Sequence, residues 1–261
     1  MTEPLLTFDE VSGVTQNCAL EEDFPISFEL KPGEIGIIRC GILASSVTRL
    51  AALRGIVTRG RITILGNSVS AADDPALYLS PDFTKRFIAG IGFCQKSGGL
   101  IANLTIIQNV MLPAHYHSNN PAFGPFIELA RKRLEEMGVP PKFWYLRSSE
   151  VPQEFRKRVL FARSIMNNPP LLILDEPTEE IPWSQTRDVA SWILSQKAKG
   201  MGILIATGND PFAALLGDWA VDLCNRIRVS TRSDLETYFG DIIKRSGMLP
   251  SRPTTEEKTY A

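Results

Sequence analysis

The sequence has 261 residues, with little histidine and no long apolar run. The chain has only two histidines, His115 and His117, so we expect neither a Ser-His-Asp triad nor a histidine-rich metal site. No apolar stretch reaches the roughly 18 residues of a membrane-spanning helix, and the start of the chain is unlike a signal peptide. We therefore expect no bound metal, and contact with a membrane only through a partner.

Cysteine is also scarce, since only four occur. They are scattered without a Cys-x-x-Cys pair, which argues against a zinc site and against a disulfide scaffold. Cys40 and Cys94 each follow a predicted central strand and could lie close together, although buried free thiols are the commoner outcome.

The chain also has no large excess of positive or of negative charge. The 28 basic and 29 acidic residues leave a formal net charge of −1, and no basic cluster resembles a track for a phosphate backbone. We expect no nucleic acid as a partner. Hydrophobic residues make up 44% of the chain, which suits a sizeable buried core. The length fits one large α/β domain, or a core that carries an inserted subdomain.

The most informative stretch that is present is residues 171–178, Leu-Leu-Ile-Leu-Asp-Glu-Pro-Thr. Four consecutive Leu and Ile residues predict a strand buried on both faces, as in a parallel sheet. Asp175 and Glu176 follow at the carboxyl end of this strand, where open α/β sheets bind ligands. In P-loop NTPases such a pair serves Mg²⁺ and the attacking water. The loop that binds the phosphates in such a site should then lie far upstream in the sequence.

The remaining pattern alternates between strands and helices. Apolar or alternating runs predict strands at residues 5–8, 26–30, 35–38, 60–66, 88–93 and 201–207. Helical patterns cover residues 46–53, 126–137, 152–168 and 185–198. Gly138 is a natural stop after the second of these helices. Residues 246–261 are polar, and we expect a disordered tail there.

This order of elements, together with four short motifs, resembles the ATP-binding subunit of ABC transporters. The motifs are Gly33-Glu34 before a strand, Gln95 at a strand end, Ala162-Arg163 on a helix, and residues 174–178. The resemblance covers residues 5–230. It implies an α/β, P-loop NTPase-like ABC nucleotide-binding-domain fold with an antiparallel β subdomain, a parallel core sheet and a helical insert. The implied RecA-like core spans residues 1–95 and 161–245, and the implied helical insert spans residues 96–160.

Two runs narrow the resemblance further. Residues 95–100, Gln-Lys-Ser-Gly-Gly-Leu, and residues 109–113, Asn-Val-Met-Leu-Pro, look like the Q-loop region of Mla-type, MCE-associated lipid transporters. This resemblance implies transport of a lipid or another hydrophobe. It implies a transmembrane permease as partner, contacted through the Q-loop and the helical insert, and an ABC-type homo- or heterodimer. The chain would then lie on the cytoplasmic face of an inner membrane.

The phosphate-binding loop of the family is degenerate in this chain. Such a loop needs glycines, so that successive N–H groups point at the phosphates, as well as a lysine and a hydroxyl ligand for Mg²⁺. Here the glycine positions hold Cys40 and Ser45, the lysine position holds Ser46, and the hydroxyl position holds Val47. Thr48 stands one residue too late. We expect Ser45 to strain a positive-φ turn, and Val47 cannot bind metal, so we expect no ATP or Mg²⁺ cofactor.

Two further motifs of the family are lost. Its signature loop, Leu-Ser-Gly-Gly-Gln, offers N–H groups and a positive helix end to a phosphate on the partner subunit. The corresponding stretch here holds Pro152, which has no N–H, and Gln153 and Glu154 in place of the glycines. The Glu154 carboxylate would repel a phosphate. Gly208 replaces the histidine of the family's switch position.

The acidic pair therefore allows two interpretations. In one, Asp175 is a Mg²⁺ ligand and Glu176 is a general base. In the other, which we favour, both are structural carboxylates near the degenerate loop. Gln95 is compatible with either interpretation, because in the family its loop also touches the membrane partner. Arg39 or Arg49 could replace the missing lysine, although solvent or core-edge positions are commoner for such arginines.

Three functions remain open. We favour a degenerate ABC subunit that is the structural or regulatory partner of a permease, with little or no ATP hydrolysis and with Glu176 as a vestige. The second possibility is a weakly active ATPase that binds ATP through the relocated Arg39 or Arg49. The third is a non-transport interaction module built on the same fold.

Overall fold

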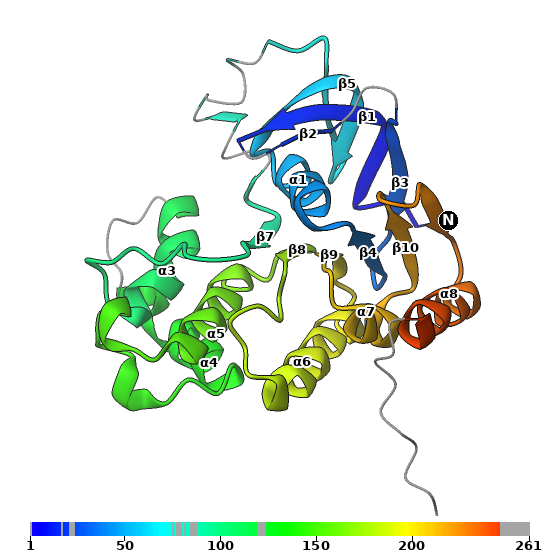
Figure 1. The fold of residues 1–261 in the computed structure, drawn as a ribbon. Coiled ribbons are helices and arrows are strands. Elements are labelled where there is room, and N and C mark those ends of the chain that lie inside the picture. Colours follow the sequence, from blue (N-terminus) through cyan, green and yellow to red (C-terminus); the bar gives the residue numbers. More distant parts are fainter. Residues whose placement is uncertain are drawn as a thin grey trace, which may run out of the picture.

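The structure is a computed structural model that describes residues 2–16, 18–20, 24–74, 76, 80, 82–83, 88–118 and 124–245. The predicted tail at residues 246–261 lies outside these ranges. Figure 1 shows how the elements are arranged. The strands are β1 (Leu6–Thr15), β2 (Ala19–Leu20), β3 (Ile26–Leu30), β4 (Ile35–Arg39), β5 (Gly55–Ile64), β6 (Asn67–Ser70), β7 (Ile91–Cys94), β8 (Leu171–Asp175), β9 (Gly202–Ala206), β10 (Trp219–Asp222) and β11 (Ile227–Val229). The α-helices are α1 (Gly41–Ala51), α3 (Ile106–His117), α4 (Ile127–Glu136), α5 (Gln153–Ser164), α6 (Thr186–Ala198), α7 (Asp210–Leu216) and α8 (Arg232–Arg245).

An antiparallel sheet forms the outer layer. Its strand order is β2-β1-β5-β6, and β3 pairs with β1. The alternation along β3 explains its position, because Ile26, Phe28 and Leu30 are buried while Glu29 is exposed. Phe28 stacks on Phe8 of β1 with the ring centroids 4.6 Å apart. One face of this sheet is therefore apolar and packs onto the rest of the chain.

A second sheet forms the centre, with the strand order β11-β10-β4-β9-β8-β7. Its pairings are parallel except for the pairing of β10 with β11. Every residue of β8 and β9 is buried, as the apolar runs predict. Gly36 of β4 makes room for the ring of Trp219, since a Cβ there would lie 2.2 Å from that ring.

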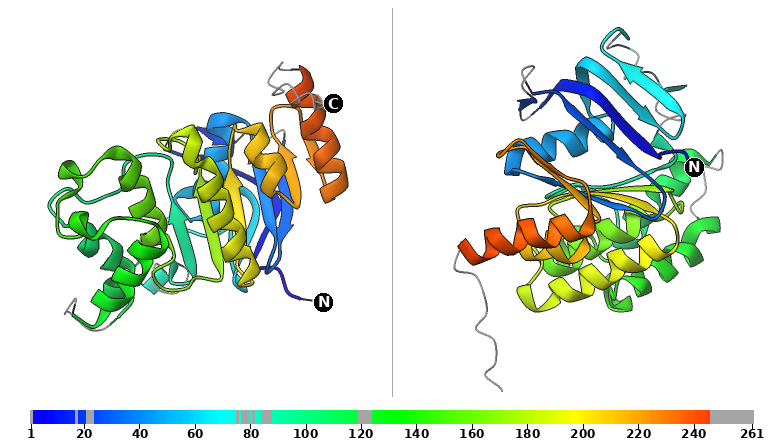
Figure 2. Two further views of the ribbon diagram at one scale, coloured as in Figure 1. Left: turned by 90° about the horizontal axis from the view of Figure 1, so that it is seen from below. Right: turned by 90° about the vertical axis from the view of Figure 1, so that its right-hand side faces the viewer.

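Helices cover both faces of the central sheet. α1 packs between the two sheets, whereas α6 and α7 lie on the opposite face of the central sheet (Figures 1 and 2). α3, α4 and α5 pack on one another as a group, drawn in green, to the side of the β7 edge. The carboxyl ends of β4, β9 and β8 thus meet the start of α1 at one edge of the sheet.

Several predicted boundaries are wrong. α1 begins at residue 41 rather than 46, α5 ends at residue 164 rather than 168, and β7 spans residues 91–94 rather than 88–93. β1 and β5 are longer than their apolar patterns, because each strand pairs with the other along nearly its whole length. Among the described residues, no helix has both the length and the apolar character needed to cross a bilayer.

Candidate functional site

The edge where β8 ends brings two predicted motifs into contact. β8 ends at Asp175, and β4 leads through Cys40 directly into α1. The hydroxyl of Ser45, on α1, donates a hydrogen bond to Asp175 Oδ1 at 2.6 Å. Asp175 is fully buried, and its Oδ2 has no hydrogen-bond partner among the described residues. One oxygen of this carboxylate is therefore satisfied from within the chain.

The stretch that corresponds to the phosphate-binding loop is helical. α1 begins at Gly41, and its N-cap residue, Cys40, has a φ of 112°. Positive φ values fall on Cys40 and Gly41 and not on Ser45, so the predicted strain at Ser45 is wrong. The reason is local, because Leu43 and Ala44 favour a helix and no further glycine holds the loop open.

The next three side chains of α1 point into the interior. The hydroxyl of Ser46 lies 3.1 Å from that of Thr15 on β1, in a buried pair. Val47 is fully buried in the core. Thr48 donates its hydroxyl hydrogen to the carbonyl oxygen of Ser45 at 2.9 Å. No sequence pattern predicts Thr15 as a partner of Ser46, because only the tertiary fold brings β1 against α1.

Glu176 faces the loop that follows β9. Its carboxylate accepts hydrogen bonds from the backbone N–H of Gly208 at 3.0 Å and from the hydroxyl of Thr207 at 3.2 Å. Burial raises the pKa of Glu176 above its usual value, while the bonds from Gly208 and Thr207 act in the opposite direction. Gly208, at the switch position, thus contacts the acidic pair through its backbone, a contact that requires no histidine.

Lys96 is a cation at this edge that the motif analysis missed. Its Nζ lies 3.1 Å from Glu179 Oε2, in an ion pair exposed to solvent. The hydrogen bond to Glu179 raises the pKa of Lys96, and the negative charges of Glu176 and Asp175 add to this effect. The signal was present in the sequence, because Lys96 follows Gln95 at the carboxyl end of a parallel strand and such ends share one edge.

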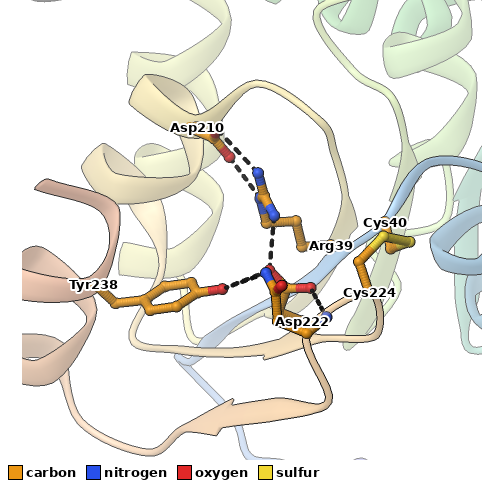
Figure 3. The surroundings of a disulfide bond; sticks show 7 residues. Arg39, Cys40, Asp210, Asp222, Cys224 and Tyr238 are labelled. Atoms are coloured by element: carbon orange, nitrogen blue, oxygen red, sulfur yellow. Dashed lines mark hydrogen bonds and ion pairs between the residues drawn. A yellow bond between two sulfur atoms is a disulfide. The ribbon is translucent and has the colours of Figure 1, made fainter. Parts of the chain in front are cut away.

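Neither predicted substitute for the missing lysine is free to act as one. The Nε of Arg39 donates to Asp210 Oδ1 at 2.7 Å, and its Nη1 donates to Asp222 Oδ2 at 2.7 Å. Tyr238 also donates to Asp222, so the network joins β4, α7, β10 and α8 (Figure 3). The hydrogen bond to Asp210 raises the pKa of Arg39 above its already high value. Arg49 lies in the last turn of α1, at the end opposite the phosphate-loop stretch.

A disulfide joins Cys40 to Cys224, whose Cα atoms are 5.4 Å apart (Figure 3). The suggestion that Cys40 could lie close to Cys94 is wrong, and so is the expectation of a free thiol at Cys40, whereas Cys94 is a buried free thiol as expected. The reason is strand order: β9 and β8 separate β4 from β7, whereas β10 is a direct neighbour of β4. Cys224 follows β10, so the bond ties the start of α1 to the loop after that strand.

The stretch that corresponds to the family's signature loop stands at the start of α5. Pro152 is the N-cap residue, and Gln153 and Glu154 belong to the first turn, so this helix begins as predicted. Within the described ranges, no side-chain hydrogen bond or ion pair links these three residues to α1 or to the acidic pair. The structure therefore does not bring the signature residues to the edge where β8 ends.

The Gln95 loop is fastened to the same helix. The Gln95 side chain donates to the carbonyl oxygen of Ser97 at 2.8 Å. Lys157 of α5 is fully buried, and its Nζ donates to the carbonyl oxygens of Gln95 at 3.0 Å and Lys96 at 2.7 Å. A lysine is almost never buried to this extent without such partners. α5 therefore fixes the path of the loop.

The residues present do not fit Mg²⁺ and ATP bound in the usual way. Ser46, in the lysine position, is paired with a buried hydroxyl, and Val47, in the metal-ligand position, is apolar. Asp175 Oδ1 is taken by Ser45, and a single free carboxylate oxygen does not make a Mg²⁺ site. In the part of the chain that the structure describes, no group of three or more His, Cys, Asp and Glu side chains could hold a metal ion.

The two sheets around α1, the acidic pair at the end of β8 and the helical group beyond β7 define the class of protein, an ATP-binding cassette. The family model described as "ABC transporter" matches residues 25–179. The chain belongs to the ABC transporter family. The predicted resemblance to ABC transporter ATP-binding subunits is thereby confirmed, whereas its Mla-type refinement stays a prediction.

Curated relatives agree with this assignment. The chain is 30% identical over 192 residues to the lipoprotein-releasing system ATP-binding protein LolD of Jannaschia sp. (strain CCS1), covering 72% of this chain and 80% of that protein. It is 28% identical over 185 residues to the protein of the same name from Anaplasma marginale (strain St. Maries), covering 70% and 79%. It is 27% identical over 214 residues to the probable syringafactin export ATP-binding/permease protein SyfD of Pseudomonas syringae pv. syringae (strain B728a), covering 78% and 31%.

Solved structures establish the fold. The dimeric post-hydrolysis state of the ATP-binding cassette MJ0796 bound to ADP and Pi superposes with a TM-score of 0.71, at 20% identity, over 84% of this chain and 94% of that one. An ATP-binding subunit of an ABC transporter gives a TM-score of 0.72, at 20% identity, over 94% and 100%. The predicted fold class is confirmed.

Proposed function

We propose that this chain is a degenerate ABC subunit of a membrane transporter, a structural or regulatory partner of a permease that hydrolyses little or no ATP. The observation that carries the proposal is the helical phosphate-loop stretch, in which Ser45 satisfies Asp175 at 2.6 Å. A phosphate could enter only by breaking this buried hydrogen bond and unwinding the start of α1. Glu176, the candidate general base, is held by Gly208 and Thr207.

The transported molecule is, on this proposal, a lipid or another hydrophobe. The names of the relatives support it, because they describe a lipoprotein-releasing system and the export of syringafactin. An Mla-type, MCE-associated assembly remains the finer prediction from residues 95–100 and 109–113. The chain would form an ABC-type homo- or heterodimer on the cytoplasmic face of an inner membrane and contact the permease through the Gln95 loop and the group α3–α5.

The other two functions have less support. A weakly active ATPase needs a free cation at the phosphate-loop stretch, but two carboxylates hold Arg39, and Arg49 lies at the far end of α1. A non-transport module would need no permease, whereas the curated relatives are named as parts of release or export systems.

Equilibrium binding of a fluorescent ATP analogue to the purified chain tests the loss of nucleotide binding. We expect no saturation up to about 1 mM, a free energy of binding weaker than about −4 kcal/mol, with or without Mg²⁺. Asp175→Asn is the matched variant, and its binding curve should coincide with that of the wild type. Saturable micromolar binding that depends on Mg²⁺ and on Asp175 would contradict the proposal.

Capture of the tagged chain from membranes of its source tests the transport assignment separately. A stoichiometric complex with a polytopic permease is the expected result. If the folded wild-type chain retains no membrane protein at all, the transport assignment is wrong and the interaction-module alternative takes its place.

A further inference from the structure

The disulfide between Cys40 and Cys224 lies in the wall of a pocket of about 300 Å³. Cys224 is exposed, whereas Cys40 is half-buried at the start of α1. We call this space the disulfide pocket. Its other walls are apolar except for Arg226, and they are formed by Leu20, Phe24, Ile26, Leu43 and Leu223. A small molecule in the pocket would therefore lie beside the disulfide.

The two sulfur atoms have different surroundings. Cys40 is the N-cap residue of α1, a helix of 11 residues whose start has no side-chain cap. The first N–H groups of a helix have no partner within it, so a thiolate at Cys40 would be stabilised by them and by the positive end of the helix dipole. Cys224 lies in the loop between β10 and β11. In thiol–disulfide exchange the sulfur that is more stable as a thiolate leaves more readily. These surroundings favour attack on Cys224 and release of Cys40.

The backbone at Cys40 depends on what surrounds it. Its φ of 112° lies in a region that residues other than glycine rarely adopt, and such a conformation persists only where the surrounding structure holds it. The next residue, Gly41, also has a positive φ, of 45°. The disulfide is a covalent restraint on the first of these two residues. Opening the bond removes this restraint, so the start of α1 can relax.

The loop that carries Cys224 is held in place by hydrogen bonds as well as by the disulfide. The N–H of Leu223 donates to the carbonyl oxygen of Arg39 at 3.1 Å. The N–H of Asn225 donates to Asp222 Oδ1 at 3.0 Å, and the other oxygen of Asp222 accepts from Arg39 (Figure 3). The residues that precede the two cysteines thus stay bonded to each other after reduction. The two thiols remain neighbours, and the disulfide can form again.

We propose that the Cys40–Cys224 bond is a redox switch, which is opened by a small thiol that carries a carboxylate and binds in the disulfide pocket. The volume suits a small molecule, and Arg226, whose guanidinium lies 5.1 Å from the ring centroid of Phe24, is the cation that pairs with the carboxylate. The inference goes beyond the proposed function. It takes from that proposal only the cytoplasmic setting, where disulfides are usually transient or redox-sensing.

The exchange has two steps. The thiolate of the small molecule attacks Cys224 Sγ, a mixed disulfide forms, and the bond to Cys40 breaks, so that Cys40 leaves as a thiolate. A second thiolate of the same kind attacks the small-molecule sulfur of the mixed disulfide and releases Cys224. Two small thiols are thereby oxidised to one disulfide, and the protein disulfide takes up their two electrons. The protein thiolates take protons from water.

Reduced glutathione is the probe for the first step. The purified, folded Cys18→Ser chain is used, because Cys18 is a free thiol that would compete for reagents, whereas Cys94 is buried. After a short reaction, iodoacetamide traps the free thiols and mass spectrometry locates both groups. We expect glutathione on Cys224 and the carbamidomethyl group on Cys40. The reverse arrangement, or a bond that opens only in urea that unfolds the chain, overturns the inference.

The diethyl ester of glutathione has the same thiol without free carboxylates, so it tests the pocket. Glutathione should open the bond about threefold faster than the ester, the scale of one exposed charge pair. This preference should vanish in Arg226→Gln. Arg228→Gln is the matched control, since Arg228 is an exposed arginine two residues further along and outside the pocket, and it should keep the preference. Equal rates for the two thiols in the wild type overturn the assignment of a carboxylate-bearing thiol.

Hydrogen exchange tests whether the bond acts as a switch. In the reduced, folded chain the N–H groups of residues 41–44 should exchange at least about tenfold faster than in the oxidised chain, while those of β4 and β10 should not change. Unchanged exchange at the start of α1 would show that the bond is opened without a structural response, and it would overturn the switch. All three experiments use the purified chain, so their failure leaves the proposed function standing.

Discussion

Two regions of this chain place charged side chains beside an apolar interior, and they treat those charges in opposite ways. At the β8 edge, formed by Ser45, Asp175, Glu176 and Gly208, the carboxylates receive hydrogen bonds from the chain itself. A pocket of about 440 Å³ beside β7 is lined by Arg54 and Arg163, and we call it the basic pocket; no ion pair joins either arginine to a carboxylate of the described residues. The first region has the motif that identifies the family, and the second has none.

The two regions differ in the binding free energy that they offer to a ligand. At the β8 edge a ligand must first break the hydrogen bonds that Ser45 makes to Asp175 Oδ1 and that Gly208 and Thr207 make to Glu176, which lowers the binding free energy that is left. In the basic pocket, burial together with neighbouring positive charge lowers the pKa of Arg54 and of Arg163. The two regions thus differ in the groups that meet their charges: hydrogen-bond donors of the chain at the β8 edge, and a ring face and a backbone carbonyl in the basic pocket.

The largest expected effect concerns the disulfide that ties the start of α1 to the loop after β10. The Cys40–Cys224 bond spans 184 positions of the chain, and a cross-link that closes so long a loop stabilises a fold by about 4 kcal/mol. Reduction with dithiothreitol should lower the free energy of unfolding in urea by about that amount. Cys224→Ser should remove the sensitivity to reduction.

Cys18→Ser is the control for the disulfide, because Cys18 is a free thiol. This variant should keep the full sensitivity to reduction. If maleimide labels both Cys40 and Cys224 in the folded, non-reduced protein, the bond does not form and the start of α1 is not covalently closed.

The next effect concerns the hydrogen bond at the centre of the β8 edge. Ser45→Ala removes the hydroxyl donor and leaves the fully buried carboxylate of Asp175 unpaired, which should cost about 3 kcal/mol of unfolding free energy. Ser149→Ala, on an exposed residue, should change it by less than about 0.5 kcal/mol. The contrast with Arg54→Gln, for which no loss is expected, tests the two regions in one assay. If Ser45→Ala and Arg54→Gln lowered the free energy of unfolding by similar amounts, the proposed difference between the two regions would be wrong.

The smallest effect is the pH dependence due to Glu176. Its pKa is raised in the folded chain, so the folded state holds this proton more tightly than the unfolded state does. The contribution to stability is therefore fully present below the ordinary value of 4.5 and is lost as the pH rises through the raised pKa. Urea unfolding of the wild type and Glu176→Gln between pH 4 and 7 should show the variant gaining relative stability with pH. A difference that stays constant over this range would show that Gly208 and Thr207 fully offset the burial.

Much of the fold follows from local pattern. The apolar runs that became β8 and β9 predict strands buried on both faces, and Gly138 marks the end of α4 with a φ of 64°. The sequence pattern predicts a helix from residue 46, whereas α1 begins at residue 41, because Leu43 and Ala44 extend the helix toward its start.

The site was less predictable, because its partners come together only in the tertiary fold. The spacing of the cysteines does not show that β10 is the neighbour of β4, so Cys224 could not be chosen over Cys94. Thr15 reaches Ser46 across two layers of the fold. The basic pocket has no motif at all, since Arg54 and Arg163 are 109 positions apart and are united only by packing around β7.

The buried Lys157 has a mechanical consequence. Its Nζ donates to the carbonyl oxygens of residues 95 and 96, so α5 and the Gln95 loop are joined by two buried hydrogen bonds. Helix α5 carries Arg163, which lines the basic pocket. The Gln95 loop carries Lys96, which pairs with Glu179 near the acidic pair. Any movement of α5 would therefore be passed to Lys96 and to the Glu179 carboxylate that Lys96 faces.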